Sequence, residues 1–309
     1  MVKILLTGAT GFVGQRLTTE LLEKKYSIVA SVRKQSTNLP ENIRQDIVGD
    51  LSQNTEWGEA LHNIDVVIHA ASRVHVMKEA SLDIDPLTEF RRVNVDGTLN
   101  LVQQSITAGV KRFIFISSIK VNGEMTSLGH PFTAADSISV KDPYGLSKYE
   151  AEQGLLELAK NTDMEVVIVR PPLIYGPNVK ANFQSMIRWV NKGVPLPFAS
   201  VRNQRSLLAL DNLVDFIICC IYHPKAGNEV FLISDNEDVS MTELLQKIAK
   251  ALGKRPRLFP IPVKLVWFLA KMIGKGDLCN RLFGSLQVDS SRARDLLGWK
   301  PVITMDEQL

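Results

Sequence analysis

The sequence predicts an α/β protein with a doubly wound parallel sheet and a smaller, mostly helical second domain. Two observations lead to this prediction. A glycine-rich turn over 8–14 joins an apolar strand to a helix, and strand-like and helix-like stretches then alternate as far as residue 169. Beyond Arg170 that alternation gives way to prolines, loops and short helical stretches. A cofactor domain interrupted by a second domain is therefore expected.

Length and composition are those of an ordinary globular protein. The 309 residues, 45% of them hydrophobic and 22% charged, suffice for one large domain or two interleaved ones. With 36 basic and 33 acidic residues the net charge is only +3, which predicts no nucleic-acid partner.

The three cysteines and the apolar segments bear on metal binding and location. Cys219, Cys220 and Cys279 have no metal-site or disulfide spacing, so we expect no metal and a reducing, cytoplasmic location. No signal peptide is apparent. The most apolar run, 263–273, contains two lysines and is too short to span a bilayer.

The first strand and turn predict a dinucleotide site. Residues 2–7 form a short apolar strand, and glycines follow it at 8, 11 and 14. Any tight strand-to-helix turn favours glycine, but here the glycines would also admit a pyrophosphate to the free N–H groups of the helix. The expected cofactor-binding residues are Gly8, Thr10, Gly11, Phe12, Val13 and Gly14.

The second strand, 27–32, should end beside the adenosine ribose. NAD-specific sites usually place an acidic residue there, whereas an arginine suits the 2′-phosphate of NADP. Arg33 follows this strand, so the prediction is NAD(P) with a preference for NADP, against the alternative of a solvated basic loop. Asp50 and Leu51, after the next apolar segment, are expected at the adenine.

Small residues follow the strand at 65–70. Ala70, Ala71 and Ser72 would let the backbone pass close to the cofactor, whereas His69 is expected to be structural. A long helix over 87–108 contains Asn94, which we expect to tie neighbouring loops together.

The stretch from Ser117 to Lys148 contains the candidate catalytic residues. A strand over 113–116 delivers Ser117 and Ser118, and a helix starting near 145 would place Tyr144 and Lys148 on one face. A tyrosine has a pKa near ~10, and an adjacent ammonium would lower it. Tyr144 could then exchange a proton with a substrate oxygen held by Ser118. The alternative is that Tyr144 merely begins a helix and Lys148 is solvated.

The rest of the chain divides between the two expected domains. A strand is predicted over 165–169, and a strand (206–210), a helix (211–222) and a strand (230–233) are predicted to return to the sheet. Helices are predicted over 241–252 and 290–297, and Thr304 and Glu307 have the spacing of a capping box. The predicted domains are 1–170 with 206–233 for the dinucleotide, and 171–205 with 234–309 for the substrate.

Taken as a set, these motifs resemble the extended short-chain dehydrogenase/reductases, the NAD-dependent epimerase/dehydratase family. The resemblance rests on the glycine turn, Ser118, Tyr144 with Lys148, Arg170-Pro-Pro-Leu-Ile-Tyr-Gly-Pro177 and the closing segment 293–301. It implies a Rossmann fold in which Tyr144 is the acid/base, Lys148 holds the nicotinamide ribose and Ser118 binds the reacting oxygen. The expected cofactor-binding residues also include Asn94, Ser117, Tyr144, Lys148 and Pro171.

The resemblance also suggests substrate contacts. Nucleotide-sugar dehydratases carry an Asp-Glu pair where this chain has Ile119-Lys120, so elimination is not expected. UDP-galactose 4-epimerases have an asparagine where this chain has Leu173. Residues that match the family's diphosphate contacts are Asn182 and Arg205, and Arg281 is a further candidate.

The sequence thus predicts an NAD(P)-dependent oxidoreductase acting at C4 of a UDP-hexose. The pattern looks most like a 4-epimerase-like subgroup that contains 4-keto-sugar reductases. The preferred hypothesis is such a reductase, because Arg33 favours an exchanging NADPH. The alternative is a UDP-glucose or UDP-N-acetylglucosamine 4-epimerase. A reductase of small ketones or thioesters and a cofactor-binding module without turnover are further hypotheses. Helices near Leu99 and Leu155 could form a homodimer.

Overall fold

The computed structural model describes residues 2–74, 85–138, 140–179, 181–262, 272 and 282–309. Its main feature is a sheet of seven parallel strands in the order β3-β2-β1-β4-β5-β6-β9. The strands are β1 (Lys3–Thr7), β2 (Ser27–Val32), β3 (Arg44–Ile47), β4 (Val66–His69), β5 (Arg112–Ile116), β6 (Glu165–Arg170) and β9 (Glu229–Leu232). The chain builds outward in one direction from β1 and in the other from β4. The predicted doubly wound sheet is therefore confirmed.

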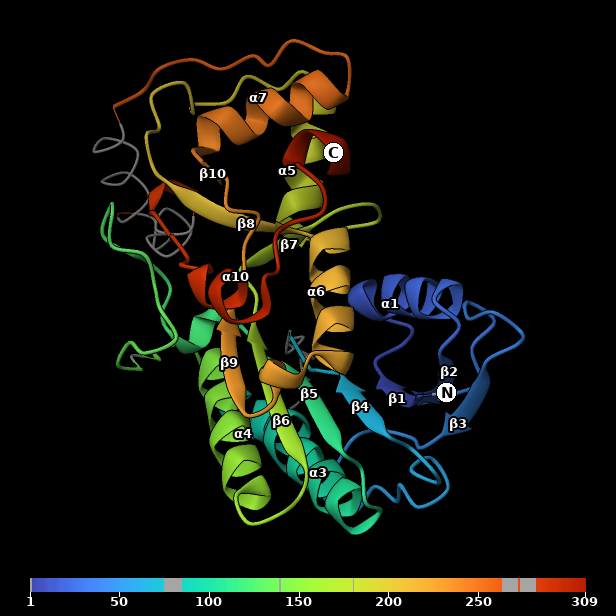
Figure 1. The fold of residues 1–309 in the computed structure, drawn as a ribbon. Coiled ribbons are helices and arrows are strands. Elements are labelled where there is room, and N and C mark those ends of the chain that lie inside the picture. Colours follow the sequence, from blue (N-terminus) through green and yellow to red (C-terminus); the bar gives the residue numbers. More distant parts are fainter. Residues whose placement is uncertain (1, 75–84, 139, 180, 263–271, 273–281) are drawn as a thin grey trace.

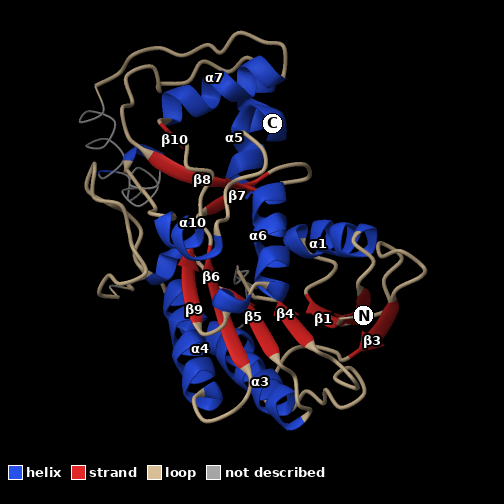
Figure 2. Cartoon of the chain, viewed as in Figure 1, coloured by secondary structure: helices blue, strands red, loops and turns tan. Residues whose placement is uncertain are grey.

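Helices cover both faces of this sheet (Figures 1 and 2). Alternate strand residues point to opposite faces, so Ile4 and Leu6 enter one core and Leu5 the other. The helices α1 (Phe12–Glu23) and α6 (Leu210–Tyr222) pack on the first face, and α3 (Gly97–Thr107) and α4 (Pro143–Ala159) pack on the second. The carboxyl ends of the strands are left open for a ligand.

The helix predicted over 87–108 has an irregular centre. It consists of α2 (Pro86–Arg91), a π-helical segment η1 (Arg92–Asp96) and α3, joined without a break in helical conformation. Such π-helical turns occur frequently at functional sites. Asn94 lies in this segment and is almost fully buried.

A second, three-stranded sheet contains β10 (Asp238–Val239), β8 (Arg205–Ala209) and β7 (Leu173–Tyr175). The helices α5 (Ala181–Asn191) and α7 (Met241–Ala251) share a separate apolar core with it. The prediction that the strand at 206–210 returns to the main sheet is wrong, because β8 pairs in parallel with β7 and antiparallel with β10. The helix that follows, α6, does return to the main sheet.

The carboxylate of Asp235 joins the two sheets to the C-terminal segment. It accepts hydrogen bonds from the Tyr175 hydroxyl at 2.7 Å, the Ala209 N–H and the Asn212 amide. Asn212 in turn accepts from the N–H groups of 302 and 303. The last elements are α10 (Ser291–Leu297) and α11 (Met305–Gln308), and the predicted capping box of Thr304 and Glu307 is present at α11. Two 3₁₀ turns are η2 (Ile119–Val121) and η3 (Pro224–Ala226).

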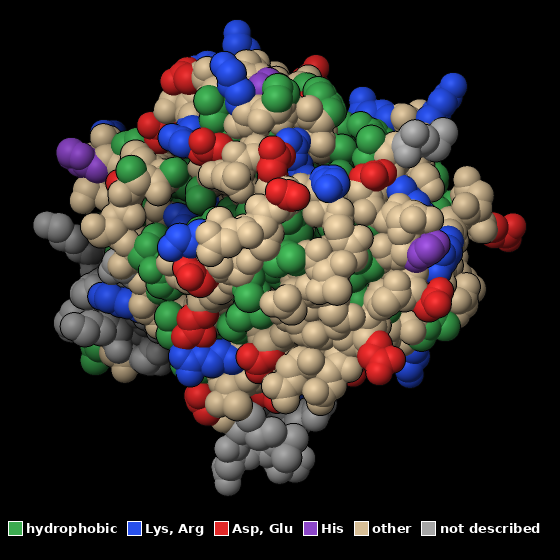
Figure 3. Space-filling model, turned by 60° about the horizontal axis from the view of Figure 1, so that its bottom comes forward, with side chains coloured by type: hydrophobic (Ala, Val, Ile, Leu, Met, Phe, Trp, Pro, Cys, Tyr) green, Lys and Arg blue, Asp and Glu red, His purple; other side chains and the backbone are tan. Residues whose placement is uncertain are grey.

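The described helices and surface contain both apolar and charged residues. None of the helices in the described ranges is long and apolar enough to cross a bilayer. On the face shown in Figure 3, basic and acidic side chains are interspersed. Leu155 is fully buried in the main core, and Leu99 packs against the same core. Both leucines therefore contribute to packing within the subunit.

Candidate active site

A cleft of about 560 Å³ lies at the carboxyl ends of β1, β2 and β4. Among its lining residues are nine that the sequence predicted for the cofactor: Gly8, Thr10, Gly11, Arg33, Asp50, Leu51, Ala70, Ala71 and Ser72. Sequence analysis missed Arg73 and Val93, which also line it. The position is the one where doubly wound sheets bind ligands, beside the point at which the strand order reverses.

Close packing explains the glycines of the first turn. Gly8 has φ +73°, and a Cβ there would lie 2.7 Å from the backbone nitrogen of Ala71. A Cβ on Gly14 would lie 2.0 Å from the carbonyl oxygen of Gly8. Gly11 is the N-cap of α1 and provides no side-chain cap, so N–H groups of the first helical turn are left for an anion. Phe12 and Val13 follow and pack against the core.

Replacing Gly14 by alanine should therefore destroy the cleft. We expect a loss of about 1–3 kcal/mol in unfolding free energy, the usual cost of overpacking, and at least a tenfold weaker affinity for NAD. Urea unfolding and calorimetric titration with NAD measure the two effects. Gly58→Ala is the matched control, because a Cβ at Gly58 meets no atom within 4 Å. An unaltered NAD affinity in Gly14→Ala would contradict the assignment of the cleft.

A buried hydroxyl without a partner also fits a dinucleotide. Ser117, at the end of β5, is only 4% exposed, and its Oγ has no hydrogen-bond partner. Such a buried group normally has one. Beside it, the carbonyl of Pro171 accepts from the N–H of Ile119 at 3.0 Å and so joins the ends of β5 and β6. The glycine turn, the uncapped helix and this hydroxyl together suit a bound dinucleotide.

At the ribose end of the cleft, Arg33 and Asp50 form an ion pair. Arg33 Nη1 lies 3.6 Å from Asp50 Oδ1, and both side chains are largely exposed. The predicted 2′-phosphate contact of Arg33 would have to compete with this carboxylate.

His69 has the structural role that the sequence analysis expected. Its Nδ1 lies 2.7 Å from Thr7 Oγ1 and its Nε2 lies 3.0 Å from Thr98 Oγ1, so the ring joins β1 to α3. Burial and the nearby charge of Lys148 lower the pKa of His69 to about 3. The ring is therefore neutral at physiological pH.

Asn94 ties the loop after β4 to α4, as expected. Its Oδ1 accepts from the Ser72 hydroxyl at 3.2 Å and from the Arg73 N–H at 2.8 Å. Its Nδ2 donates to the Arg73 carbonyl and to Ser147 Oγ, both at 3.0 Å. The π-helical segment thereby fixes the loop that lines the cleft.

Tyr144 lies in the first turn of α4, beside the cleft. Its ring packs edge-on to Phe90. Burial, with a smaller contribution from Asp142, raises the pKa of Tyr144 to about 12, and the nearby Ser72 hydroxyl opposes the rise. The sequence analysis expected a lowered pKa. The direction differs because burial disfavours the phenolate in the protein alone.

Lys148 follows Tyr144 by one helical turn but lies deeper. It is 1% exposed, and its Nζ is 4.1 Å from the centroid of the Phe115 ring. Burial lowers the pKa of Lys148 to about 7, while the carboxylate of Glu152 acts in the opposite direction. Lys148 therefore titrates near neutrality in the protein alone.

Ser118 sits directly after β5, as predicted. It is the N-cap of η2, and its Oγ accepts from the Lys120 N–H at 3.3 Å. Buried hydrogen bonds and an ion pair stabilise the turn that carries Ser118. Asn122 accepts from Arg170 at 3.0 Å, and Arg170 forms a two-pronged ion pair with Glu152. The end of β6, α4 and the Ser118 turn are thus joined.

Three of the other predicted substrate residues lie on the three-stranded sheet and on α5. Leu173 is exposed at the start of β7, and Asn182 is exposed on α5. Arg205 begins β8, where its Nη1 donates to the Gly284 carbonyl at 3.1 Å and burial lowers its pKa. Arg281 lies outside the described residues. The substrate contacts of all four remain predictions.

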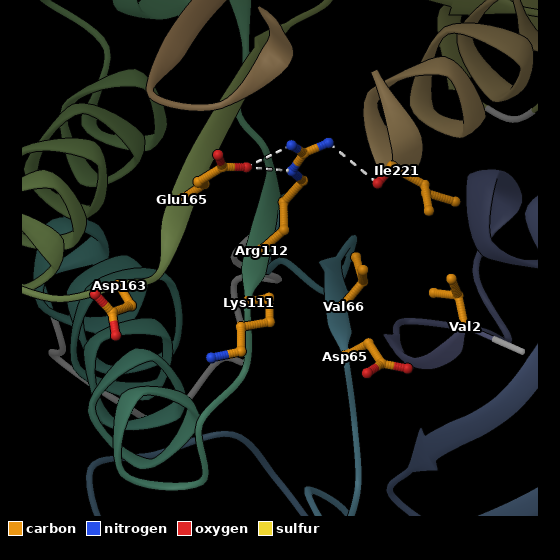
Figure 4. A pocket seen from close by; sticks show the side chains of 8 residues that line it. All are labelled: Val2, Asp65, Val66, Lys111, Arg112, Asp163, Glu165 and Ile221. Atoms are coloured by element: carbon orange, nitrogen blue, oxygen red, sulfur yellow. Dashed lines mark hydrogen bonds and ion pairs between the residues drawn. The ribbon is translucent and has the colours of Figure 1, made fainter. Parts of the chain in front are cut away.

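A second cavity lies at the amino ends of the strands, and buried polar interactions occupy its wall. It measures about 590 Å³ and is lined by residues at the amino ends of β4, β5 and β6. Arg112, almost buried there, pairs with Glu165 and donates to the carbonyl of Ile221 (Figure 4). It also donates to the carbonyls of 220 and 223. None of the predicted site residues lines this cavity.

Comparison with known proteins points to one family. The model of the NAD dependent epimerase/dehydratase family matches residues 4–234. A UDP-glucose 4-epimerase from Vibrio cholerae is 50% identical over 98% of this chain and 92% of its own length. An N-acetyl-α-D-glucosaminyl-diphospho-ditrans,octacis-undecaprenol 4-epimerase from Escherichia coli O157:H7 is 30% identical over 85% of this chain and 76% of its own length.

Solved structures share the fold. MoeE5 in complex with UDP-glucuronic acid and NAD has a TM-score of 0.78 at 25% identity, covering 99% of this chain and 96% of the other. UDP-glucose 4-epimerase from Thermotoga maritima, with UDP-glucose, has a TM-score of 0.77 at 22% identity and the same coverage.

Proposed function

This chain belongs to the NAD dependent epimerase/dehydratase family, and we propose that it is a UDP-hexose 4-epimerase. It is an enzyme of the extended short-chain dehydrogenase/reductase class. The observation that carries the proposal is the 50% identity to the UDP-glucose 4-epimerase of Vibrio cholerae over 98% of the chain. The sequence analysis preferred a 4-keto-sugar reductase, but this relative supports its alternative better.

The site can supply the proton transfers that epimerisation requires. The chemistry that NAD provides when bound is the acceptance and return of the C4 hydride. Tyr144 Oη takes the proton of the C4 hydroxyl as the alcohol becomes a ketone, and Ser118 Oγ donates a hydrogen bond to the same oxygen. After the ketone turns over, Tyr144 Oη would return the proton to the C4 oxygen, to which Ser118 Oγ would again donate a hydrogen bond.

The raised pKa of Tyr144 adds a condition to this mechanism. In the protein alone the hydroxyl keeps its proton at neutral pH, because its pKa is about 12. Positive charge beside the phenol, from the Lys148 ammonium or from a cofactor bound in the cleft, would favour the phenolate and make Tyr144 a base.

The second domain is proposed to hold the UDP group. Arg205 and Asn182 are the proposed diphosphate contacts, because a guanidinium matches the geometry of phosphate oxygens. The proposed substrate domain comprises residues 171–205 and 234–309.

We also propose a cytoplasmic location, because a reducing compartment suits the free thiols of Cys219 and Cys220.

The direct test is sugar interconversion without consumption of cofactor. Purified protein with saturating NAD should convert UDP-glucose or UDP-N-acetylglucosamine to a mixture with its C4 epimer, with no net NADH formed. Separation of the nucleotide sugars by chromatography measures the mixture. Failure to interconvert either sugar, in protein shown by calorimetry to bind NAD, would overturn the proposal.

A 4-keto-sugar reductase is the second candidate, favoured by Arg33 at the ribose end of the cleft. Reduction would consume NADPH stoichiometrically with a UDP-4-keto-6-deoxy sugar, measured as lost absorbance. If Arg33 holds a 2′-phosphate, Arg33→Ala should weaken NADP binding about tenfold or more and leave NAD binding nearly unchanged, because a charge-assisted phosphate contact contributes about 1.5–3 kcal/mol. If Arg33→Ala changed the affinities for NAD and NADP equally, the ion pair with Asp50 would be the only role supported for Arg33.

A homodimer through the helices near Leu99 and Leu155 stays a prediction. Sedimentation of the purified protein would test it.

A further inference from the structure

Lys120 contacts both Ser118 and the N-terminus of the helix that carries Tyr144. Its backbone N–H donates to Ser118 Oγ at 3.3 Å. Its side-chain Nζ donates to Asp142 Oδ2 at 2.9 Å. Asp142 is the N-cap of α4, and the same Oδ2 accepts from the Gly145 N–H at 3.0 Å. One residue therefore connects the Ser118 turn to the helical turn that carries Tyr144.

Two further contacts bring Lys120 against that turn. Its ammonium lies 5.7 Å from the centroid of the Tyr144 ring, within the range of a cation–π interaction. Its carbonyl oxygen packs so closely on α4 that a Cβ at Gly145 would lie 2.8 Å away. The side chains of Lys120 and Asp142 are 32% and 17% exposed, so their pairing is screened less than that of a fully exposed pair.

We propose that Lys120 is a positioning residue that fixes the Ser118 turn against α4 and balances the charge of Asp142 beside the Tyr144 phenol. The proposal rests on the acid–base role proposed for Tyr144. If Lys120 only held the N-cap residue Asp142 in place, its charge would not affect the ionisation of Tyr144. The two roles can therefore be separated by the titration of the phenol.

The sign of the effect follows from the two charges. The carboxylate of Asp142 raises the pKa of Tyr144, because a negative neighbour disfavours the phenolate. The ammonium of Lys120 compensates that carboxylate. Removing the lysine charge should thus make the phenol harder to ionise, and removing the aspartate charge should make it easier.

Other charges around Tyr144 stay constant in this comparison. The elements packed against α4 include α2 and η1. The charged groups on these elements and nearby are Lys148 and Glu150 on α4, Glu89 and Arg91 on α2, Arg92 and Asp96 on η1, and Arg73 after β4. Arg73 pairs with Glu89 at 3.1 Å and Arg91 pairs with Glu150 at 2.5 Å.

The experiment compares Lys120→Met, Asp142→Asn and the double variant. With NAD bound, the ultraviolet difference spectrum against the same protein carrying Tyr144→Phe reports ionisation of this one phenol. Lys120→Met should raise the pKa of Tyr144 by about 0.5–1 unit, Asp142→Asn should lower it by a similar amount, and the double variant should return near the wild type. Asparagine remains a good N-cap, so Asp142→Asn changes the charge more than the cap.

Two controls separate charge from structure. Lys120→Arg keeps the charge and should titrate like the wild type. Lys160→Met removes an exposed lysine at the other end of α4 and should leave the titration unchanged. Shifts of the same sign in Lys120→Met and Asp142→Asn, or shifts no larger than that of Lys160→Met, would overturn the proposal. If Lys120→Met does not fold, the absence of a shift in Asp142→Asn would overturn it equally.

The readout also keeps this proposal separate from the proposed function. Epimerisation of UDP-glucose is measured on the same variants. Absence of that activity in every protein, with the opposite shifts present, would overturn the proposed reaction and support the role of Lys120. Full activity with no shifts would do the reverse.

Discussion

Replacing Tyr144 by phenylalanine should lower kcat for C4 epimerisation by about 10²–10⁴-fold, the usual contribution of a positioned acid–base group. The hydroxyl is the only group removed, and the ring keeps its packing against Phe90. The affinity for NAD should stay nearly unchanged, because the glycine turn and the uncapped end of α1 are untouched. Initial rates with UDP-glucose and calorimetric titration with NAD measure the two quantities.

Tyr149→Phe is the matched control, since Tyr149 is a half-buried tyrosine of the same helix. It should retain the activity of the wild type. If Tyr144→Phe kept more than a tenth of the wild-type kcat, another group would have to act as the base and the proposed mechanism would be wrong.

Replacing Arg170 by methionine should lower the unfolding free energy by about 3–5 kcal/mol, because it leaves the carboxylate of Glu152 buried without its partner. The two side chains are 5% and 1% exposed and form a two-pronged ion pair. Arg170 also holds Asn122 in the Ser118 turn, so the activity of the folded fraction should fall as well. Urea denaturation followed by circular dichroism measures the stability.

An exposed pair provides the comparison. Arg292 pairs with Glu229 at the surface, and Arg292→Met should cost no more than about 1 kcal/mol. The double variant with methionine at both 170 and 152 should recover much of the loss, since no unpaired charge then remains buried. A loss in Arg170→Met no greater than that in Arg292→Met would show that the buried pair contributes little.

Much of the main sheet could be predicted from the sequence because most of its strands are short apolar runs, and β1 and β5 end directly before glycine or serine. The strand at 27–32 and the helix at 241–251 were predicted within one residue of their observed bounds. Nine of the predicted cofactor residues share one cleft for the same reason, since the carboxyl ends of neighbouring parallel strands meet at one edge.

Other features depend on contacts between distant residues and leave no local pattern. The strand β7 has three residues and was missed, and the pairing of β8 with it could not be read from either segment alone. The pKa of Tyr144 depends on burial by the folded chain, which the spacing of Tyr144 and Lys148 does not reveal. The position of Ser72 near Tyr144 depends on the loop after β4, which Asn94 holds.

The position of Asn94 depends on the number of residues in the π-helical segment. A π turn holds more residues than an α turn, so loss of a single codon between 92 and 96 could restore a regular helix. A π turn accommodates its extra residue in nearly the same total rotation as an α turn, so α2 and α3 would keep their faces, including that of Leu101 and Val102, and only residues within 92–96 would change position. Asn94 would swing away from the loop that it holds. An in-frame deletion could thus inactivate the protein without altering any residue that meets the substrate, and gene comparisons in this region should score gaps as carefully as substitutions.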